Sequence, residues 1–317
     1  MSVRSVRNRL WTKVYNNCVT YGESSFEYKI CSRLRDAKIK NTPYEKLPLV
    51  RTVMDDKKII VPLSHNIPMY KKNYDNYDKA IAVLAKMVLH HEGKLNFVDV
   101  GANVGDTIIN VGIFDEAKYL LVEGNPLFYN LIEENLNLND ENINYVLEKS
   151  FISDDEDKHF KINNRMSSAS LTPTDVETED TFKSLDRVIR EYSFEPNIVK
   201  SDTDGFDFKV LRSGRETFEK YKPYIFFEWV PLWLERNHEN PMSIWNYLNS
   251  LGYEKAIAFD NYGNPISLID TNDGDNLRLF MNYTKNRNKR IYYFDFLLFN
   301  SSKQFDVNEY MKQFENY

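Results

Sequence analysis

The fold is decided by one stretch of sequence, which runs Val98-Asp99-Val100-Gly101-Ala102-Asn103-Val104-Gly105-Asp106-Thr107. The apolar run over residues 96–100 predicts a buried strand that ends at Gly101, and a helix is expected from about Gly105. Gly101 lets the backbone turn sharply and lets a ligand approach where a Cβ would collide. We expect Gly105 to permit close contact at the helix entry. Ligands of open α/β sheets lie beyond the carboxyl ends of strands, which is where this turn falls.

Short apolar strands alternate with helical patterns on both sides of that stretch. Further strands are predicted over residues 119–123, 143–147, 197–201, 224–228, 256–259 and 292–299. This alternation is typical of βαβ units and a parallel sheet. The sequence therefore predicts an α/β fold with a Rossmann-like, mostly parallel sheet of about seven strands. The acidic segment over 150–180 interrupts the alternation, and we expect a hairpin and a loop near the site there.

Three parts are predicted along the chain. Residues 1–74 form an N-terminal extension of helices and strands that caps the site, residues 75–300 form the ligand-binding domain, and residues 301–317 form a C-terminal helix or tail. Val3, Val6, Leu10 and Val14 recur at helical spacing, which predicts a basic amphipathic helix in residues 1–20. We expect this helix to pack on its own domain, although it could also contact a membrane surface or a second copy of the chain.

Composition excludes several classes of protein. The 317 residues carry a net charge of −6, whereas a nucleic-acid partner selects for an excess of Lys and Arg. The two cysteines, Cys18 and Cys31, form no Cys-x-x-Cys pair, so neither a disulfide framework nor a structural zinc site is expected. No apolar run approaches the ~20 residues of a membrane-spanning helix. We therefore predict a cytoplasmic protein without a transmembrane segment.

The charge of the glycine turn separates two classes of ligand. A dinucleotide uses the spacing G-x-G-x-x-G, and Asn103 occupies the second of those glycine positions here. Asp99 and Asp106 would also bring carboxylates near a pyrophosphate. S-adenosylmethionine has no phosphate and carries a positive sulfonium and an ammonium group, which acidic side chains suit. The turn therefore favours S-adenosylmethionine; an NAD(P)-dependent oxidoreductase and a non-catalytic binding protein of the same fold are the alternatives.

The second strand ends in Glu123, which lies 22 residues beyond Gly101. A carboxylate at this place can accept both ribose hydroxyls of an adenosine ligand. The adenine is then expected near Asn125, Pro126 and Phe128. The remaining residues of the predicted cofactor site are Ala102, Thr107, Ser150 and Phe151.

Three motifs together resemble the FkbM-type methyltransferase family. They are Val98 to Gly105, Val122-Glu123-Gly124-Asn125-Pro126 and Val199-Lys200-Ser201-Asp202-Thr203-Asp204-Gly205-Phe206, and the resemblance spans about residues 60–230. It implies S-adenosylmethionine-dependent O-methylation of sugars, polyketides or other secondary metabolites, often in cell-surface glycan or lipid-sugar pathways. A segment before the core, Val61 to Tyr70, also looks similar to some relatives.

The resemblance also implies roles for individual residues. Contacts to the methionine half of the cofactor fall to Asp99, Gly101, Asn103 and Gly105, and the ribose contact falls to Glu123. Asp202 would lie beside the donor methyl group and the acceptor. Many members have hydrophobic-Glu-Gly after that Asp, whereas this chain has Thr203-Asp204-Gly205. The acid is one methylene shorter, which puts in doubt whether it reaches the same partner.

Methyl transfer to oxygen requires alignment of the acceptor and a base. The sulfonium is already a strong electrophile, so orientation can supply much of the rate. A sugar hydroxyl is a poor nucleophile, and the candidate bases are Asp202, His65 and Asp204. Asp202 and Asp204 would also suit Mg²⁺, but a required metal is not expected. Glu228, at the end of its strand, could face the acceptor.

The predicted function is therefore O-methylation of a hydroxyl of a sugar or of a cell-surface glycan or glycolipid precursor, in polysaccharide biosynthesis. The product of the cofactor is S-adenosylhomocysteine. A carbohydrate or glycolipid is the expected partner, and a homo-oligomer is compatible with the sequence.

Overall fold

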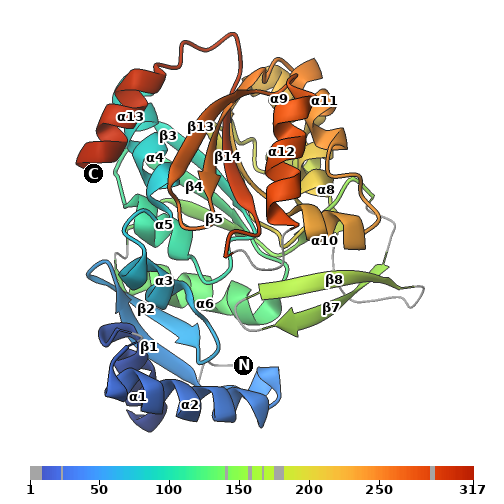
Figure 1. The fold of residues 1–317 in the computed structure, drawn as a ribbon. Coiled ribbons are helices and arrows are strands. Elements are labelled where there is room, and N and C mark those ends of the chain that lie inside the picture. The colour runs from blue at the N-terminus through green and yellow to red at the C-terminus, as the bar shows by residue number, and fades with distance from the viewer. Residues whose placement is uncertain are drawn as a thin grey trace.

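The computed structural model describes residues 9–22, 24–139, 142–155, 159–165, 168–174, 182–285 and 290–317. Its centre is an eight-stranded sheet with the order β13-β12-β14-β11-β10-β3-β4-β5 (Figure 1). The strands are β3 (Leu95–Val100), β4 (Ala117–Val122), β5 (Tyr145–Glu148), β10 (Ile198–Ser201), β11 (Tyr224–Trp229), β12 (Lys255–Asp260), β13 (Pro265–Asp270) and β14 (Phe294–Phe299). The five strands from β5 to β11 are parallel, and β14, β12 and β13 each run antiparallel to their neighbours.

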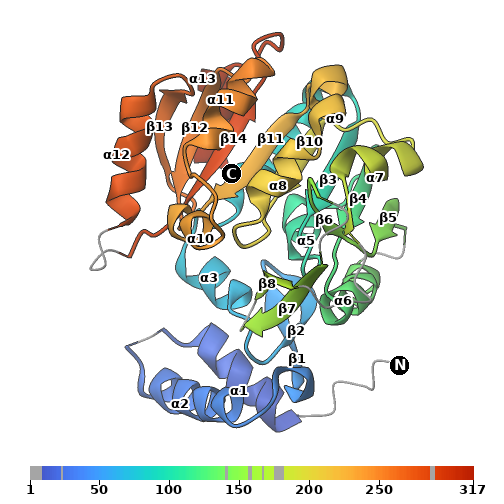
Figure 2. The same ribbon diagram turned by 90° about the vertical axis from the view of Figure 1, so that its right-hand side faces the viewer.

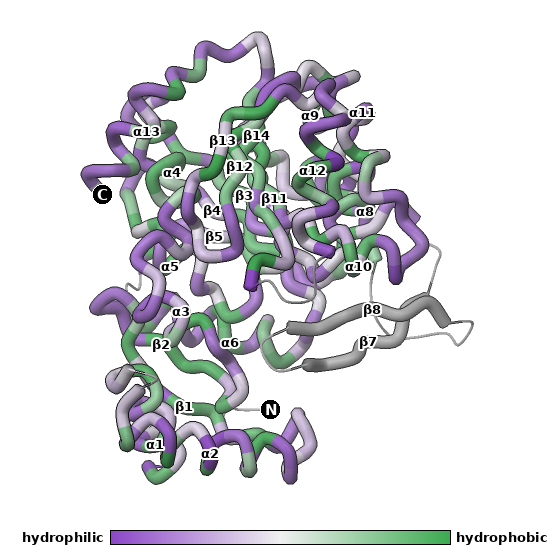
Figure 3. Tube along the Cα trace, in the orientation of Figure 1, coloured by the Kyte–Doolittle hydropathy of each residue, from purple (hydrophilic) through white to green (hydrophobic). Residues whose placement is uncertain are grey.

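The predicted α/β fold with a Rossmann-like, mostly parallel sheet is confirmed, and β13 is a strand that the sequence did not predict. Successive side chains of a strand point to opposite faces, so each strand contributes to two cores. In β3, Phe97 packs in one core while Val98 and Val100 pack in the other. Figure 3 shows these hydrophobic stretches running through the middle of the sheet.

Helices cover both faces of the sheet (Figures 1 and 2). The Phe97 core is completed by α4 (Lys79–Glu92), α5 (Asp106–Val111), α6 (Pro126–Asn137) and α13 (Val307–Asn316). The Val98 core is completed by α7 (Leu185–Glu191), α8 (Asp207–Arg212), α9 (Arg215–Tyr221), α10 (Pro231–Arg236), α11 (Ser243–Ser250) and α12 (Gly274–Thr284). Pro126 lies in the first turn of α6, where a missing backbone N–H costs nothing.

The N-terminal extension contains helices and a hairpin, as predicted. Its elements are α1 (Arg9–Thr20), α2 (Phe26–Lys40), the short η1 (Tyr44–Lys46), the antiparallel pair β1 (Leu49–Met54) and β2 (Lys57–Pro62), and α3 (Ile67–Asn73). The extension docks on α6 through Asn135. That buried side chain accepts from Ile60 N (2.7 Å) and donates to Ile60 O (2.9 Å) and Val104 O (2.8 Å). The Asn135 side chain thus pairs with both main-chain groups of Ile60, as a neighbouring strand would.

The predicted apolar face of the first helix is wrong at Leu10, which is 63% exposed. The buried face of α1 consists of Val14, Tyr15 and Cys18. Tyr15 sets this rotation because its hydroxyl donates a buried hydrogen bond to the His65 carbonyl (2.7 Å). Val3 and Val6 lie outside the described residues. Cys18 and Cys31 are both buried free thiols.

The segment after β5 contains the hairpin that was expected there. Strand β6 (Phe151–Ile152) pairs in parallel with β9 (Phe182–Lys183), and β7 (His159–Arg165) pairs with β8 (Ser168–Thr174). The β7–β8 hairpin projects from the body of the molecule (Figure 1).

Among the described helices, none has the length and apolar character to cross a membrane. The division of the chain at residues 74 and 300 stays a prediction.

Candidate active site

A cavity opens at the carboxyl ends of β3, β4 and β10, where the glycine turn lies; we call it the edge cavity. Eight of the predicted site residues line it, namely Gly101, Asn103, Glu123, Phe128, Ser150, Phe151, Asp202 and Asp204. The others lie outside its wall, namely Asp99, Ala102, Gly105, Asp106, Thr107, Asn125, Pro126 and His65. The structure therefore brings together residues from five places in the sequence. The ligand contacts of all the predicted site residues stay predictions.

Gly101 is required by the neighbouring turn. Its φ is +82°, and a Cβ at this position would lie 2.0 Å from the backbone oxygen of Asp202. The main-chain amides of Gly101 and Ala102 both donate to the Val122 carbonyl (3.0 and 3.1 Å). The turns after β3, β4 and β10 therefore pack main chain against main chain, which fixes the base of the cavity. At Gly105 the nearest atoms, on Ile132, are at ordinary contact distance (3.6 Å), so its φ of +82° is the constraint there.

The Glu123 side chain joins the turn after β3 to the turn after β4. Its carboxylate oxygens accept hydrogen bonds from the backbone amides of Asn103 (2.8 Å) and Asn125 (2.6 Å). Burial raises the pKa of this carboxyl to about 7, although those hydrogen bonds oppose the shift. Each oxygen has a second lone pair, so the ionised group can accept further hydrogen bonds from a ligand.

His65 lies behind the glycine turn and is fully buried. Its Nε2 is 3.3 Å from Asn103 Oδ1, and its ring packs edge-on against Phe128 (6.5 Å between centroids). Burial lowers the pKa of His65 to about 4, so the ring is neutral near pH 7. Arg35 of α2 holds this segment by donating to the Leu63 (2.8 Å) and Ser64 (2.9 Å) carbonyls. The role of His65 as a base stays a prediction; its contacts suit the positioning of Asn103.

Asp202 follows β10 directly, and its side chain is 51% exposed. Lys200 lies beside it, with Nζ 3.2 Å from Asp202 Oδ2 and 3.4 Å from Asp99 Oδ1. Burial raises the pKa of Asp99, and burial together with the nearby Asp78 raises that of Asp106 to about 8. Lys200 was not predicted as a site residue. The sequence feature that could have identified it is a lysine inside a strand that is otherwise predicted to be buried.

Asp207 shapes the turn that carries Asp202 and Asp204. Its buried carboxylate accepts from Ser201 Oγ (2.6 Å), Thr203 N (3.1 Å) and Gly205 N (3.3 Å). Asp204 has a left-handed φ of +52° within this turn. The sequence analysis missed Asp207, which lies in the first turn of α8. In the described part of the chain, no group of three or more His, Cys, Asp or Glu residues is arranged to hold a metal ion.

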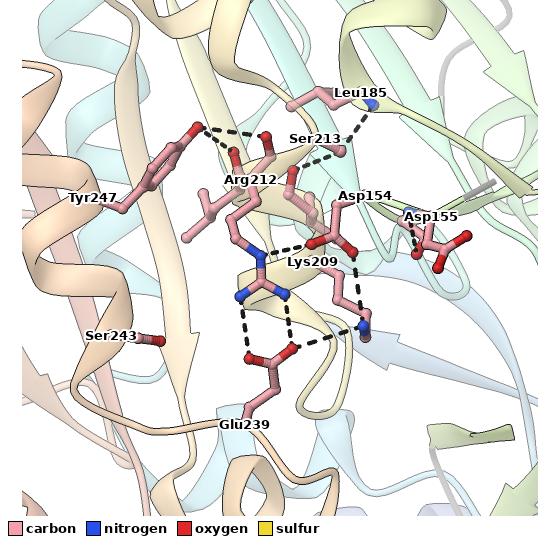
Figure 4. Close-up of polar contacts among 12 residues, drawn as sticks. Asp154, Asp155, Leu185, Lys209, Arg212, Ser213, Glu239, Ser243 and Tyr247 are labelled. Atoms are coloured by element: carbon pink, nitrogen blue, oxygen red, sulfur yellow. Dashed lines mark hydrogen bonds and ion pairs between the residues drawn. The ribbon is translucent and has the colours of Figure 1, made fainter. Parts of the chain in front are cut away.

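A network of charged groups anchors the loop after β6 (Figure 4). The Arg212 guanidinium donates to Asp154 Oδ2 (2.6 Å) and to both oxygens of Glu239 (3.1 and 2.7 Å). Lys209 Nζ lies 3.7 Å from each of the same two side chains. Because Phe151 comes three residues before Asp154, this network also holds the wall of the edge cavity. None of its members was predicted.

A second cavity lies on the other side of Asp202, and we call it the polar cavity. Its wall includes Lys200, Glu228 and Asp295 from the sheet, Asp202 just after β10, and Tyr77, Asp78, Asn261 and Tyr293 from neighbouring segments. Asp202 is thus shared by the two cavities. Of the residues that only the polar cavity contacts, Glu228 alone was considered from sequence.

A mostly parallel sheet with a cavity at the carboxyl ends of its strands is the architecture of Rossmann-like enzymes, including the S-adenosylmethionine-dependent methyltransferases. The sequence comparison specifies the family, because residues 99–255 match the model described as the methyltransferase FkbM domain. Residues 99–255 therefore form an FkbM-type methyltransferase domain, and a domain of this family implies the use of S-adenosylmethionine. This confirms the resemblance seen in the three motifs. No curated protein is significantly similar in sequence.

Several solved structures resemble the chain at low identity. Methyltransferase FkbM from Methylobacillus flagellatus KT is 12% identical, with a TM-score of 0.41, over 73% of this chain and 58% of that chain. M. jannaschii TYW2 in complex with AdoMet is 13% identical, with a TM-score of 0.42, over 82% of this chain and 90% of that chain. This chain thus spans little more than half of the length of that FkbM protein. We draw no functional conclusion from likenesses of this size.

Proposed function

We propose that the chain transfers a methyl group from S-adenosylmethionine to a hydroxyl oxygen of a sugar, or of a cell-surface glycan or glycolipid precursor. The observation that carries this proposal is the place of Asp202, a residue that lines both the edge cavity and the polar cavity. An acceptor in the polar cavity and a donor in the edge cavity would meet at this side chain.

The edge cavity has the chemistry that the donor needs. Glu123 can accept the ribose hydroxyls, and the aromatic rings of Phe128 and Phe151 offer an apolar surface to adenine. No lysine, arginine or histidine is among the described residues that line it, whereas Glu123, Asp202 and Asp204 are acidic. Such a wall suits a cationic ligand and disfavours the pyrophosphate of a dinucleotide.

The chain's own residues then supply orientation and a base. S-adenosylmethionine provides an electrophilic methyl group on a positively charged sulfur. Asp202 would hold the acceptor hydroxyl in line with that group and accept its proton as the oxygen–carbon bond forms and the sulfur–carbon bond breaks. Lys200, which pairs with Asp202, would hold the carboxylate in place. Asp204 and His65 remain proposed helpers. A cytoplasmic location also stays a prediction.

The test is a calorimetric titration of S-adenosylhomocysteine, with NADH as the control ligand. We expect micromolar binding, weakened by about 1–3 kcal/mol in Glu123→Ala because buried partners lose a hydrogen bond. Asp202→Asn should keep this affinity and lose about 10²- to 10⁴-fold in methyl transfer. Failure of S-adenosylhomocysteine to bind at millimolar concentration, or a preference for NADH, would contradict the proposal.

A further inference from the structure

Strand register gathers the acidic floor of the polar cavity. Glu228 of β11 lies directly opposite Asp295 of β14 in an antiparallel pair. Lys200 and Asp202 lie two residues apart on and just after β10, which is the other neighbour of β11. Alternation along each strand therefore places all four side chains on one face of the sheet.

Two carboxyl groups in directly opposite positions repel each other when both are ionised. Asp78 and Asp202 face the same space, and Lys200 is the only cation among the described residues of the wall. Burial raises the pKa of both Glu228 and Asp295 well above the usual value, and Asp202 adds to each shift. An arrangement that costs folding free energy in this way is typical of binding sites.

Two oxygen atoms in this wall lack hydrogen-bond partners among the described residues. They are Oδ1 of Asn261, a residue that is 7% exposed, and Oε2 of Glu228. Leaving a buried polar atom unpaired costs folding free energy. Both atoms belong to residues that line the polar cavity, so a ligand that donates hydrogen bonds would satisfy them.

Six tyrosines line this cavity or are connected to its wall by ring contacts, and we call them the tyrosine rim: Tyr70, Tyr74, Tyr77, Tyr262, Tyr292 and Tyr293. Tyr77 and Tyr293 line the cavity itself. From Tyr77 a run of ring contacts leads to Tyr70 (5.5 Å between centroids), then Tyr74 (6.2 Å) and Tyr262 (4.4 Å). Separately, Tyr292 contacts Tyr293 (4.9 Å). Tyrosines offer an apolar face together with a hydroxyl, which suits a ligand that is apolar on its faces and polar at its edges.

We infer that the polar cavity is the acceptor site and that it takes an uncharged sugar ring, with Glu228, Asp295 and Asn261 accepting hydrogen bonds from its hydroxyls. The inference rests on the proposed methyl transfer, because Asp202 is the point at which the two cavities meet. Carboxyl groups form hydrogen bonds with hydroxyls. The one cation among the described residues of the wall, Lys200, is already paired with Asp99 and Asp202, so the wall offers no free positive charge to a carboxylate or phosphate substituent. The tyrosine rim would cover the apolar faces of the ring. The site thus selects neutral sugars over acidic ones.

The direct test is saturation-transfer NMR with the full chain and S-adenosylhomocysteine. The probes are a panel of neutral methyl glycosides at millimolar concentration, each paired with the uronate of the same ring. We expect saturation transfer to a neutral glycoside and none to its uronate, with loss of the signal in Tyr77→Ala, which removes a ring from the cavity wall. Tyr21→Ala, an exposed tyrosine of the extension, is the matched control and should leave the signal unchanged.

Two results would overturn the inference: equal or stronger binding of the uronates, or no glycoside binding by a protein that binds S-adenosylhomocysteine. Failure of S-adenosylhomocysteine itself to bind would instead remove the proposed function. The two failures are therefore distinguishable in one set of samples.

A second measurement needs no sugar. Glu228→Gln and Asp295→Asn remove groups whose pKa burial raises in the folded protein above its value in the unfolded chain. The groups that face them are Lys200, Asp78, Asp202, Asp204, Asp207, Tyr77, Tyr292 and Tyr293. Relative to wild type, the Tm of each variant should rise as pH increases from about 4 to 8, reaching a gain of about 2 °C or more. Glu254→Gln, at an exposed acid, is the control. No gain in either variant at pH 8 would contradict the inferred site.

Discussion

At the scale of single residues, Gly101 is the point at which the turn after β3 packs against the turn after β10. The Asp202 carbonyl occupies the space that a side chain at position 101 would need. A change at this glycine therefore displaces the turn that carries the proposed base. Asp207 accepts hydrogen bonds from two amides of that same turn.

We predict that Gly101→Ala abolishes measurable S-adenosylhomocysteine binding and destabilises the fold by more than the about 1–2 kcal/mol of a left-handed backbone. Gly93→Ala is the matched control, since Gly93 also has a positive φ (+67°) but has open space around its Cβ position. It should show only the backbone cost and bind normally. Urea unfolding and calorimetry measure the two quantities. Similar behaviour of the two variants would show that the contact with Asp202 is unimportant.

At the scale of elements, α6 joins the extension to the edge cavity. Asn135 contacts β2 and, through the Val104 carbonyl, the glycine turn. We predict that Asn135→Ala lowers the free energy of unfolding by about 1–3 kcal/mol, because buried main-chain groups lose their partners. Asn139→Ala removes the analogous pairing with Lys58 at a more exposed place and should cost less. Equal losses in urea unfolding would argue against this role of Asn135.

The charged network of α8 supports a second element, the loop after β6. Arg212→Leu leaves Asp154 and Glu239 without their guanidinium partner. We expect S-adenosylhomocysteine affinity to fall about tenfold because Phe151 loses its support, while the exposed pair broken by Arg215→Leu should have no effect. The affinity of both variants for S-adenosylhomocysteine is measured by calorimetry. Unchanged affinity in Arg212→Leu would mean that the loop holds its place without this network.

At the scale of the whole molecule, buried acids set the response to pH. The pKa is raised to about 6 for Asp78 and Asp207, to about 7 for Glu123 and to about 8 for Asp106. The folded chain thus holds protons that the unfolded chain has released, and stability falls as pH rises through these values. His65, whose pKa is lowered to about 4, has the opposite effect only below about pH 6.5.

We therefore predict that the Tm falls between pH 6.5 and pH 8 and that Asp106→Asn removes part of this decline. The measurement is thermal unfolding at fixed ionic strength across that range. A constant or rising Tm in wild type would show that these carboxyl groups ionise as freely in the folded protein as in the unfolded chain.

The sequence predicts most of the sheet because its parallel strands are continuous apolar runs that end in glycine or acidic turns. It does not predict β13, whose residues are mostly exposed at the edge of the sheet. The glycine turn and Glu123 could be placed at the edge cavity because their spacing is local. Asn261, Asp295 and the tyrosine rim could not be placed, because their meeting depends on pairing between strands that are far apart in sequence.

The position of β14 has a consequence for synthesis. This strand lies between β11 and β12, although β12 and β13 precede it in the chain. On the ribosome, the nascent hairpin of β12 and β13 therefore waits with an unpaired edge until residues 294–299 have emerged. The parallel half of the sheet can form earlier, while the polar cavity, which needs Asp295, is completed only after β14 has emerged.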